Sequence, residues 1–138
     1  MFRNILVAFD GSDPSRRAYD TALDIAKKYD STVHVVAVAR PPEFAEEVET
    51  KAVVERERAQ LDRQLAALRV KALQAGLSPH LKIATGHTAA QIVRATEEDK
   101  IDLIILGHHG HGVFDRWLPG SVSREVIAYT RCPVMVVR

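Results

Sequence analysis

Glycine and hydroxyl residues gather near the end of the chain in a pattern that suits the binding of an anion. Gly107 and Gly110 are separated by two residues, and Gly120 and Ser121 follow after nine more. Glycines let backbone N–H groups approach a ligand closely. The free N–H groups in the first turn of a helix favour negative charge. Because an apolar run precedes Gly107 and a helical pattern follows Gly120, the spacing predicts a cradle for phosphate.

The elements that must position this cradle alternate between strands and helices. Apolar runs predict strands at 4–9, 32–39, 77–84, 101–106 and 133–137. Helical periodicity and end signals predict helices at about 14–29, 51–75, 88–100 and 121–130. Strands that alternate with helices are typical of a parallel sheet covered on both faces.

Three short signals predict where helices begin and end. Asp13 is predicted to cap the first helix, with Pro14 in its first turn. Thr88–Gln91 matches a capping box, and Gly76 is predicted to end the second helix. The apolar positions predicted to face the core are Ala18, Ala22, Ile25 and Tyr29 on the first helix and Val54, Leu61, Leu65, Leu68 and Ala72 on the second.

Asp10 and Gly107 each follow a predicted strand directly. In open parallel sheets, ligands bind beyond the carboxyl ends of the strands, where the connections change direction. The carboxylate of Asp10 can accept a hydrogen bond from a ligand hydroxyl or base, with a metal nearby. It can equally serve as a structural carboxylate at the start of the next helix. The sequence leaves both interpretations open.

The histidines at 108, 109 and 111 invite a zinc interpretation, but they lack the spaced cysteine, histidine or carboxylate partners of a firm metal site. Near a phosphate, these imidazoles would bind better when protonated, at or below about pH 6.5. The loop is not a Walker motif, because no Gly-Lys-Ser/Thr follows, and its glycine order differs from a Rossmann fingerprint.

Composition narrows the function classes. The 138 residues predict one domain, and the net charge of +1 gives no bulk attraction for nucleic acid. No nucleophile elbow or spaced carboxylate pair predicts efficient catalysis. The single cysteine, Cys132, is predicted to be structurally buried and rules out an internal disulfide. With neither a leader pattern nor a membrane span, the sequence predicts a cytoplasmic protein.

Three segments, together with the glycine spacing, resemble the universal stress protein family. They are Ile5–Ser12, which is similar to the family's opening strand and aspartate, Ile101–Gly107, similar to its fourth strand, and Arg131–Val137, similar to its closing strand. The resemblance covers essentially the whole chain. Two positions depart from the family pattern: His108 stands where many members have Ser or Thr, and His111 where a small basic residue is frequent.

The resemblance implies an α/β fold of the Rossmann-like, adenine nucleotide alpha hydrolase-like type. Its parallel open sheet would have five strands in the order 3-2-1-4-5, with ATP between the first and fourth strands. It also implies a homodimer through the last strand, Pro133 to Val137. The implied nucleotide contacts are Ala8, Phe9, Asp10, Val38, Gly107, His108, Gly110, His111, Gly112, Val113, Gly120, Ser121, Val122 and Ser123.

From these observations we expect a dimeric stress or signalling protein that responds to bound ATP, with Mg²⁺ or Mn²⁺ on the phosphates. The loop from His111 to Pro119, which carries Phe114 and Trp117, is expected to settle over the ligand and report its presence to a partner. Two alternatives stay open. One is a slow ATP hydrolase, and the other is a dimeric interaction module that binds AMP, a cyclic nucleotide or nothing.

Overall fold

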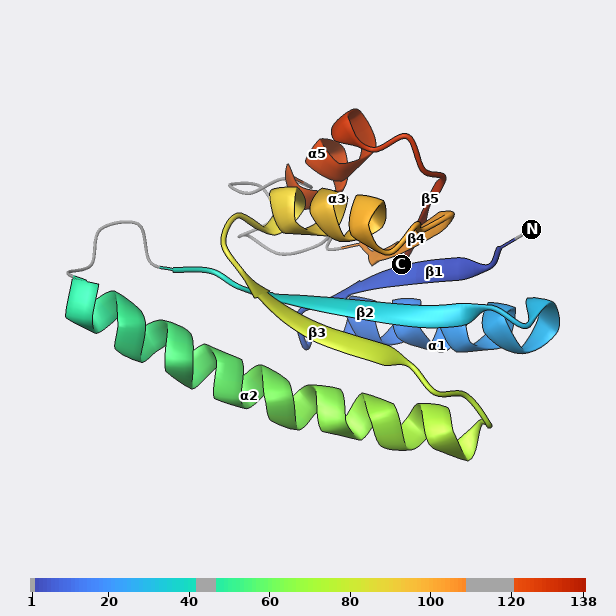
Figure 1. Cartoon of the computed structure of the whole chain (residues 1–138), viewed down its shortest axis with the longest axis horizontal. Coiled ribbons are helices and arrows are strands. Elements are labelled where there is room, and N and C mark those ends of the chain that lie inside the picture. The colour runs from blue at the N-terminus through green and yellow to red at the C-terminus, as the bar shows by residue number, and fades with distance from the viewer. Residues whose placement is uncertain (1, 42–46, 109–120) are drawn as a thin grey trace.

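Five parallel strands form the centre of the molecule in the order β3-β2-β1-β4-β5, which confirms the expected topology (Figure 1). The structure is a computed structural model that describes residues 2–41, 47–108 and 121–138. The strands are β1 (Asn4–Phe9), β2 (Thr32–Ala39), β3 (His80–Thr85), β4 (Leu103–Gly107) and β5 (Val134–Val137).

Helices cover both faces of this sheet. They are α1 (Asp13–Tyr29), α2 (Glu47–Gln74), α3 (Thr88–Glu98) and α5 (Ser121–Tyr129). In Figure 1, α1 and α2 lie on one side of the sheet, and α3 and α5 on the other. No helix within the described ranges is both long and apolar enough to span a membrane.

The central strand β1 is buried on both faces, as its continuous apolar run predicts. Ile5, Leu6 and Val7 are all fully buried. Ile5 and Val7 face the α1/α2 side, whereas Leu6 faces the α3/α5 side, because side chains alternate along a strand. Cys132 is only partly buried, on the α3/α5 side, and burial, followed by the nearby charge of Asp102, raises the pKa of its thiol.

Two predicted helix caps are wrong by one residue. Ser12, rather than Asp13, caps α1, and its Oγ accepts a hydrogen bond from the Ser15 N–H at 3.3 Å. Asp13 is instead the first helical residue. The capping box at Thr88 does not form, because Gly86 turns the chain at φ +141° and leaves His87 in the cap position without a side-chain cap bond.

Other boundaries differ from the predictions for local reasons. Strand β3 begins at His80 rather than residue 77, just after Pro79, which has no N–H to donate to a ladder. Helix α2 begins at Glu47, about one turn before the predicted start near residue 51. Tyr29 is 57% exposed rather than core. It is the last residue of α1, and its ring meets that of Phe2 edge-on, at a centroid distance of 6.0 Å.

A histidine pair lies across β2 and β3. The rings of His34 and His80 stack with centroids 5.0 Å apart. The Nε2 atom of His34 lies 3.2 Å from Oδ1 of Asn4, and its Nδ1 atom lies 3.9 Å from Oδ2 of Asp99. Burial lowers the pKa of His34; Asp99 opposes this effect, and His80 and Lys82 add to it. The folded protein therefore resists protonation of His34.

Acid should destabilise the fold through His34. The unfolded chain binds a proton at the ordinary pKa of about 6.5, whereas the folded chain binds it only at lower pH. The free energy of unfolding should therefore fall as the pH drops below about 6.5. Urea unfolding at about pH 7.5 and pH 5.5 measures this loss, and His34→Gln should reduce it. His87→Gln, which changes an exposed histidine, should keep it. An unchanged acid loss in His34→Gln would contradict the prediction.

Candidate functional site

The two central strands part at their carboxyl ends. Strands β1 and β4 pair only as far as Val7 and Ile105. Beyond that point β1 stays paired with β2 as far as Phe9, while β4 stays paired with β5 as far as Gly107. This is where the strand order changes direction, because β2 follows β1 on one side and β4 lies on the other. Open parallel sheets bind ligands at such a point.

Apolar side chains that are only partly covered border this point on the α3/α5 side. Ala8 of β1, Val38 of β2 and Val122 of α5 are all partly buried and pack against the core cluster around Leu6. Their neighbours deeper in the sheet, such as Leu6 and Val36, are fully covered. The arrangement provides an apolar surface that a flat ring can cover.

Asp10 stands directly after β1, and alternation places it on the same side as Ala8. It is exposed, and its Oδ1 atom accepts hydrogen bonds from the N–H of Ser12 at 2.9 Å and the Oγ of Ser12 at 2.5 Å. Ser12 in turn caps α1. Asp10 therefore has the structural role that the sequence left open, while its carboxylate remains accessible to solvent.

Phe9 lies on the wrong face for a side-chain contact at this site. Its ring is 3% exposed and packs in the α1/α2 core. Only its backbone remains on the side of Ala8 and Asp10. The sequence could not separate these neighbours, because a fully apolar strand shows no alternation from which to tell its two faces.

Gly107 is required by packing against α1. A Cβ atom there would lie 2.4 Å from the carbonyl carbon of Pro14 and 2.6 Å from the nitrogen of Ser15. The next N–H, that of His108, donates to the carbonyl of Val137 at 2.7 Å. It is therefore engaged in the sheet and does not face a ligand. This first part of the glycine pattern serves the sheet and its contact with α1.

Helix α5 begins at Ser121 and brings its first turn to the same side of the sheet as Ala8 and Val38. Val122 and Ser123 are half-buried. Glu125 of this helix binds His87, with Oε2 and Nε2 2.7 Å apart, and so ties α5 to the start of α3. Five predicted nucleotide contacts lie outside the described residues: Gly110, His111, Gly112, Val113 and Gly120. Phe114 and Trp117 also lie outside them.

Sequence reasoning missed a contact from α2. The side-chain amide of Gln64 lies so close to Gly11 that a Cβ atom there would be 2.8 Å from its Nε2 atom. Gly11 has φ +84°, a conformation that favours glycine. The turn that follows Asp10 therefore lies against a side chain from α2, on the opposite face of the sheet. The many residues between Gly11 and Gln64 hide this contact from any local pattern.

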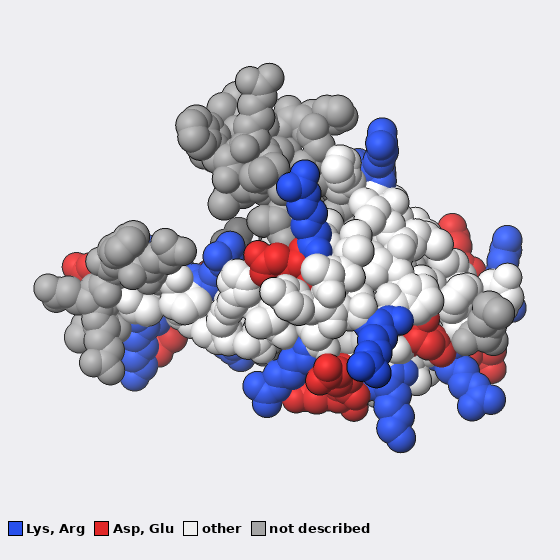
Figure 2. All heavy atoms as spheres, turned by 90° about the horizontal axis from the view of Figure 1, so that it is seen from above, with Lys and Arg blue, Asp and Glu red and all other residues white. Residues whose placement is uncertain are grey.

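The charges on the face of the molecule that Figure 2 draws are mixed. Figure 2 shows Lys and Arg interspersed with Asp and Glu on the face drawn there, rather than a continuous basic surface. Within the described ranges, histidine, cysteine and carboxylate side chains form no group of three suited to a metal ion. His108 is among these described residues, whereas His109 and His111 lie outside them.

Solved structures share this fold. One, described as a hypothetical protein MJ0577, superposes with a TM-score of 0.88 at 23% identity and covers 99% of this chain and 96% of its own. A universal stress protein in complex with cAMP has a TM-score of 0.75 at 23% identity, over 99% of this chain and 97% of its own. A family protein from Arabidopsis thaliana with AMP bound has a TM-score of 0.73 at 19% identity, over 98% and 90% of the two chains.

Sequence comparison assigns the family. A universal stress protein from Thermus aquaticus is 33% identical over 141 residues, which cover all of both chains. Universal stress protein MJ0531 from Methanocaldococcus jannaschii is 31% identical over 141 residues, covering all of this chain and 83% of its own. The model of the universal stress protein family matches residues 1–138. The chain therefore belongs to the universal stress protein family.

Proposed function

We propose that this protein binds ATP, with Mg²⁺ or Mn²⁺, at the carboxyl ends of β1 and β4, and acts in the cytoplasm as a homodimer that responds to the nucleotide. The observation that carries the proposal is the parting of these strands after Val7 and Ile105, beside partly covered apolar residues and an exposed carboxylate. The relatives with cAMP and AMP support an adenine nucleotide as the class of ligand.

Each part of the nucleotide has a proposed partner. The adenine ring covers the apolar surface of Ala8, Val38 and Val122. A ribose hydroxyl donates to the carboxylate of Asp10, and the backbone of Phe9 borders the ring. The proposed contacts to the phosphates are backbone amides at the start of α5 and in the segment before it, at Gly110, His111, Gly112, Val113, Gly120, Ser121 and Ser123. Gly107 and His108 are no longer proposed as amide donors, because the N–H of His108 already donates to Val137.

The residues present fit a divalent cation carried in by the nucleotide. Magnesium prefers oxygen ligands and is commonly held by one or two carboxylates together with substrate phosphates. Asp10 provides an exposed carboxylate at this edge of the sheet. We propose binding rather than turnover, because the Oδ1 atom of Asp10 is already engaged by Ser12 and is not poised as a base for water. A slow hydrolase remains the alternative.

The homodimer is proposed through β5. This strand stands at one end of the sheet, and its Met135 and Val136 side chains are 36% and 40% exposed. An edge strand presents unpaired backbone groups to another chain. Pairing with a second copy around a two-fold axis would cover both the edge and these side chains.

Native mass spectrometry of freshly purified protein tests both parts of the proposal. We expect particles of twice the 15.3 kDa chain that carry an adenine nucleotide, released and identified by chromatography after denaturation. Protein without nucleotide should take up ATP saturably when Mg²⁺ is added. No saturable uptake at millimolar ATP would contradict the nucleotide site. Particles of 15.3 kDa alone at micromolar protein would contradict only the dimer.

A further inference from the structure

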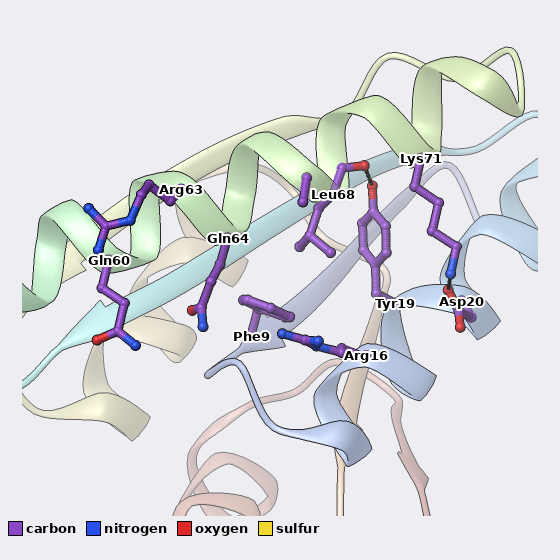
Figure 3. Close-up of a pocket in the computed structure, with 10 residues that line it drawn as sticks. Phe9, Arg16, Tyr19, Asp20, Gln60, Arg63, Gln64, Leu68 and Lys71 are labelled. Carbon is purple, nitrogen blue, oxygen red and sulfur yellow. Dashed lines mark hydrogen bonds and ion pairs between the residues drawn. The ribbon is translucent and has the colours of Figure 1, made fainter.

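A cavity of about 550 Å³ lies between α1 and α2, on the face of the sheet opposite the proposed nucleotide site. Its volume falls within the range of small-molecule pockets, about 300 to 1,000 Å³. Phe9, Ala67 and Leu68 form the apolar part of its lining. Figure 3 shows Arg16 reaching from α1 and Gln64 from α2 toward the space beside Phe9.

A buried hydrogen bond joins the two helices at the inner wall of this cavity. Tyr19 is fully buried, and its hydroxyl donates to the carbonyl of Leu68 at 2.7 Å (Figure 3). Burial, followed by the nearby charge of Asp20, raises the pKa of Tyr19 to about 12, so the phenol stays protonated and keeps this bond. The bond joins α1 to α2 across the cavity floor, so the distance between the helices is held before any ligand arrives.

The charges around the cavity favour an anion. At one end, Nζ of Lys71 lies 2.5 Å from Oδ1 of Asp20, so these two charges compensate each other. Arg16 and Arg63 also line the cavity, and within the described part of the chain neither forms an ion pair with a carboxylate. Two uncompensated guanidinium groups from different helices therefore remain. Guanidinium groups bind carboxylates and phosphates through paired hydrogen bonds.

We propose that this cavity binds a small organic anion with a carboxylate or phosphate head and an apolar body. The head binds Arg16 in the space beside Phe9, the body covers Phe9 and Leu68, and the amide of Gln64 supplies a further hydrogen bond. Arg63 adds positive charge at the far end of the cavity, where Figure 3 shows its guanidinium turned away from Arg16 and Phe9. This site shares no side chain with the nucleotide contacts proposed above, because Phe9 borders the nucleotide only through its backbone and its ring points into the α1/α2 core. The proposal stands whether or not the protein binds ATP.

Titration with three naphthalene compounds, followed by backbone amide NMR shifts, tests the proposal. The probes are 1-naphthyl phosphate, 1-naphthoate and the neutral 1-naphthalenemethanol. We expect saturable binding of at least one anion, with shifts concentrated at 13–20 and 60–71, and much weaker binding of the alcohol. The stronger of the two anions identifies the head group that the site prefers.

Arginine variants provide the matched comparison. Arg16→Gln and Arg63→Gln together should weaken binding of the preferred anion by about tenfold or more, because the first removes a charged hydrogen-bond partner and the second removes a positive charge from the cavity lining. The alcohol should bind the double variant as it binds the original protein. Arg56→Gln, an exposed change on the same helix α2, should leave all three affinities unchanged. If the double variant melts early, the two single variants replace it.

Three results would overturn the proposal. The first is no saturation by either anion at millimolar concentration. The second is equal affinity in the original protein and the arginine variants. The third is displacement of the bound anion by ATP with shifts at Ala8 and Val122, which would place the probe at the nucleotide site. The NMR shifts that report this binding come from residues of α1 and α2. They can therefore confirm the cavity even if the protein does not bind ATP.

Discussion

Replacing Gly107 by alanine is expected to lower the free energy of unfolding by roughly 2 to 3 kcal/mol. The added Cβ atom would meet Pro14 and Ser15 at 2.4 to 2.7 Å, and all three of the atoms concerned belong to the backbone. A flexible side chain could swing away, but backbone at the start of α1 can yield only if the helix or β4 moves. Urea unfolding followed by circular dichroism measures the loss.

Gly76→Ala is the matched control for this change. Gly76 has a φ of +78°, which favours glycine, but no atom lies within 4 Å of the position that its Cβ would take. Alanine there should cost about 1 kcal/mol through backbone strain alone. If Gly107→Ala were as stable as the original protein, the close approach of α1 to β4 would be wrong. If Gly107→Ala also binds ATP more weakly, the affinity must be measured where the variant is still folded, because its lower stability alone would reduce binding.

Replacing Asp10 by alanine is expected to weaken ATP binding by roughly 10- to 100-fold, which is the usual effect of losing a hydrogen bond to a charged group. Asp10 also holds Ser12, so the variant should lose some stability as well. Asp10→Asn separates the two effects, since it retains an oxygen for Ser12 but not the charge. Calorimetric titration with ATP and Mg²⁺ measures the affinity of each variant.

Asp13→Ala is the control for charge near this loop. Asp13 is exposed and is the first residue of α1, only three positions after Asp10. Its removal changes the net charge by the same amount but should leave ATP affinity within about twofold, because exposed charges are screened by salt. Equal ATP affinity in Asp10→Ala and the original protein would move the ribose contact away from Asp10.

Local patterns predicted the elements of this fold, and the resemblance supplied their order. Apolar runs located β1 and β2 to the residue, because buried parallel strands show long apolar stretches. Caps were harder to predict. Ser12 rather than Asp13 caps α1, and Asp10 holds Ser12 in place from the preceding loop. Adjacent polar residues compete for a cap, and tertiary contacts decide between them.

The sequence could predict only those features of the candidate site that follow from where a residue stands relative to a strand or helix. The position of Asp10 after β1 follows from the strand pattern. The packing of Gly107 against α1 could not be predicted in this way, because Gly107 and Pro14 are far apart in the sequence and meet only in the folded protein. The same is true of the bond from His108 to Val137 and of the contact of Gln64 with Gly11.

Helix α2 contacts the core over only part of its length. Leu61, Leu65, Leu68 and Ala72 are buried, whereas Val53, two turns before them, is 43% exposed, and the start of the helix extends past the sheet in Figure 1. Amide hydrogens in the early turns can exchange with solvent by fraying alone. Those near Leu68, which is buried in the core shared with α1, are expected to exchange only through much larger openings of the fold. One continuous helix thus contains two levels of protection, and a protease would cut it at its exposed beginning.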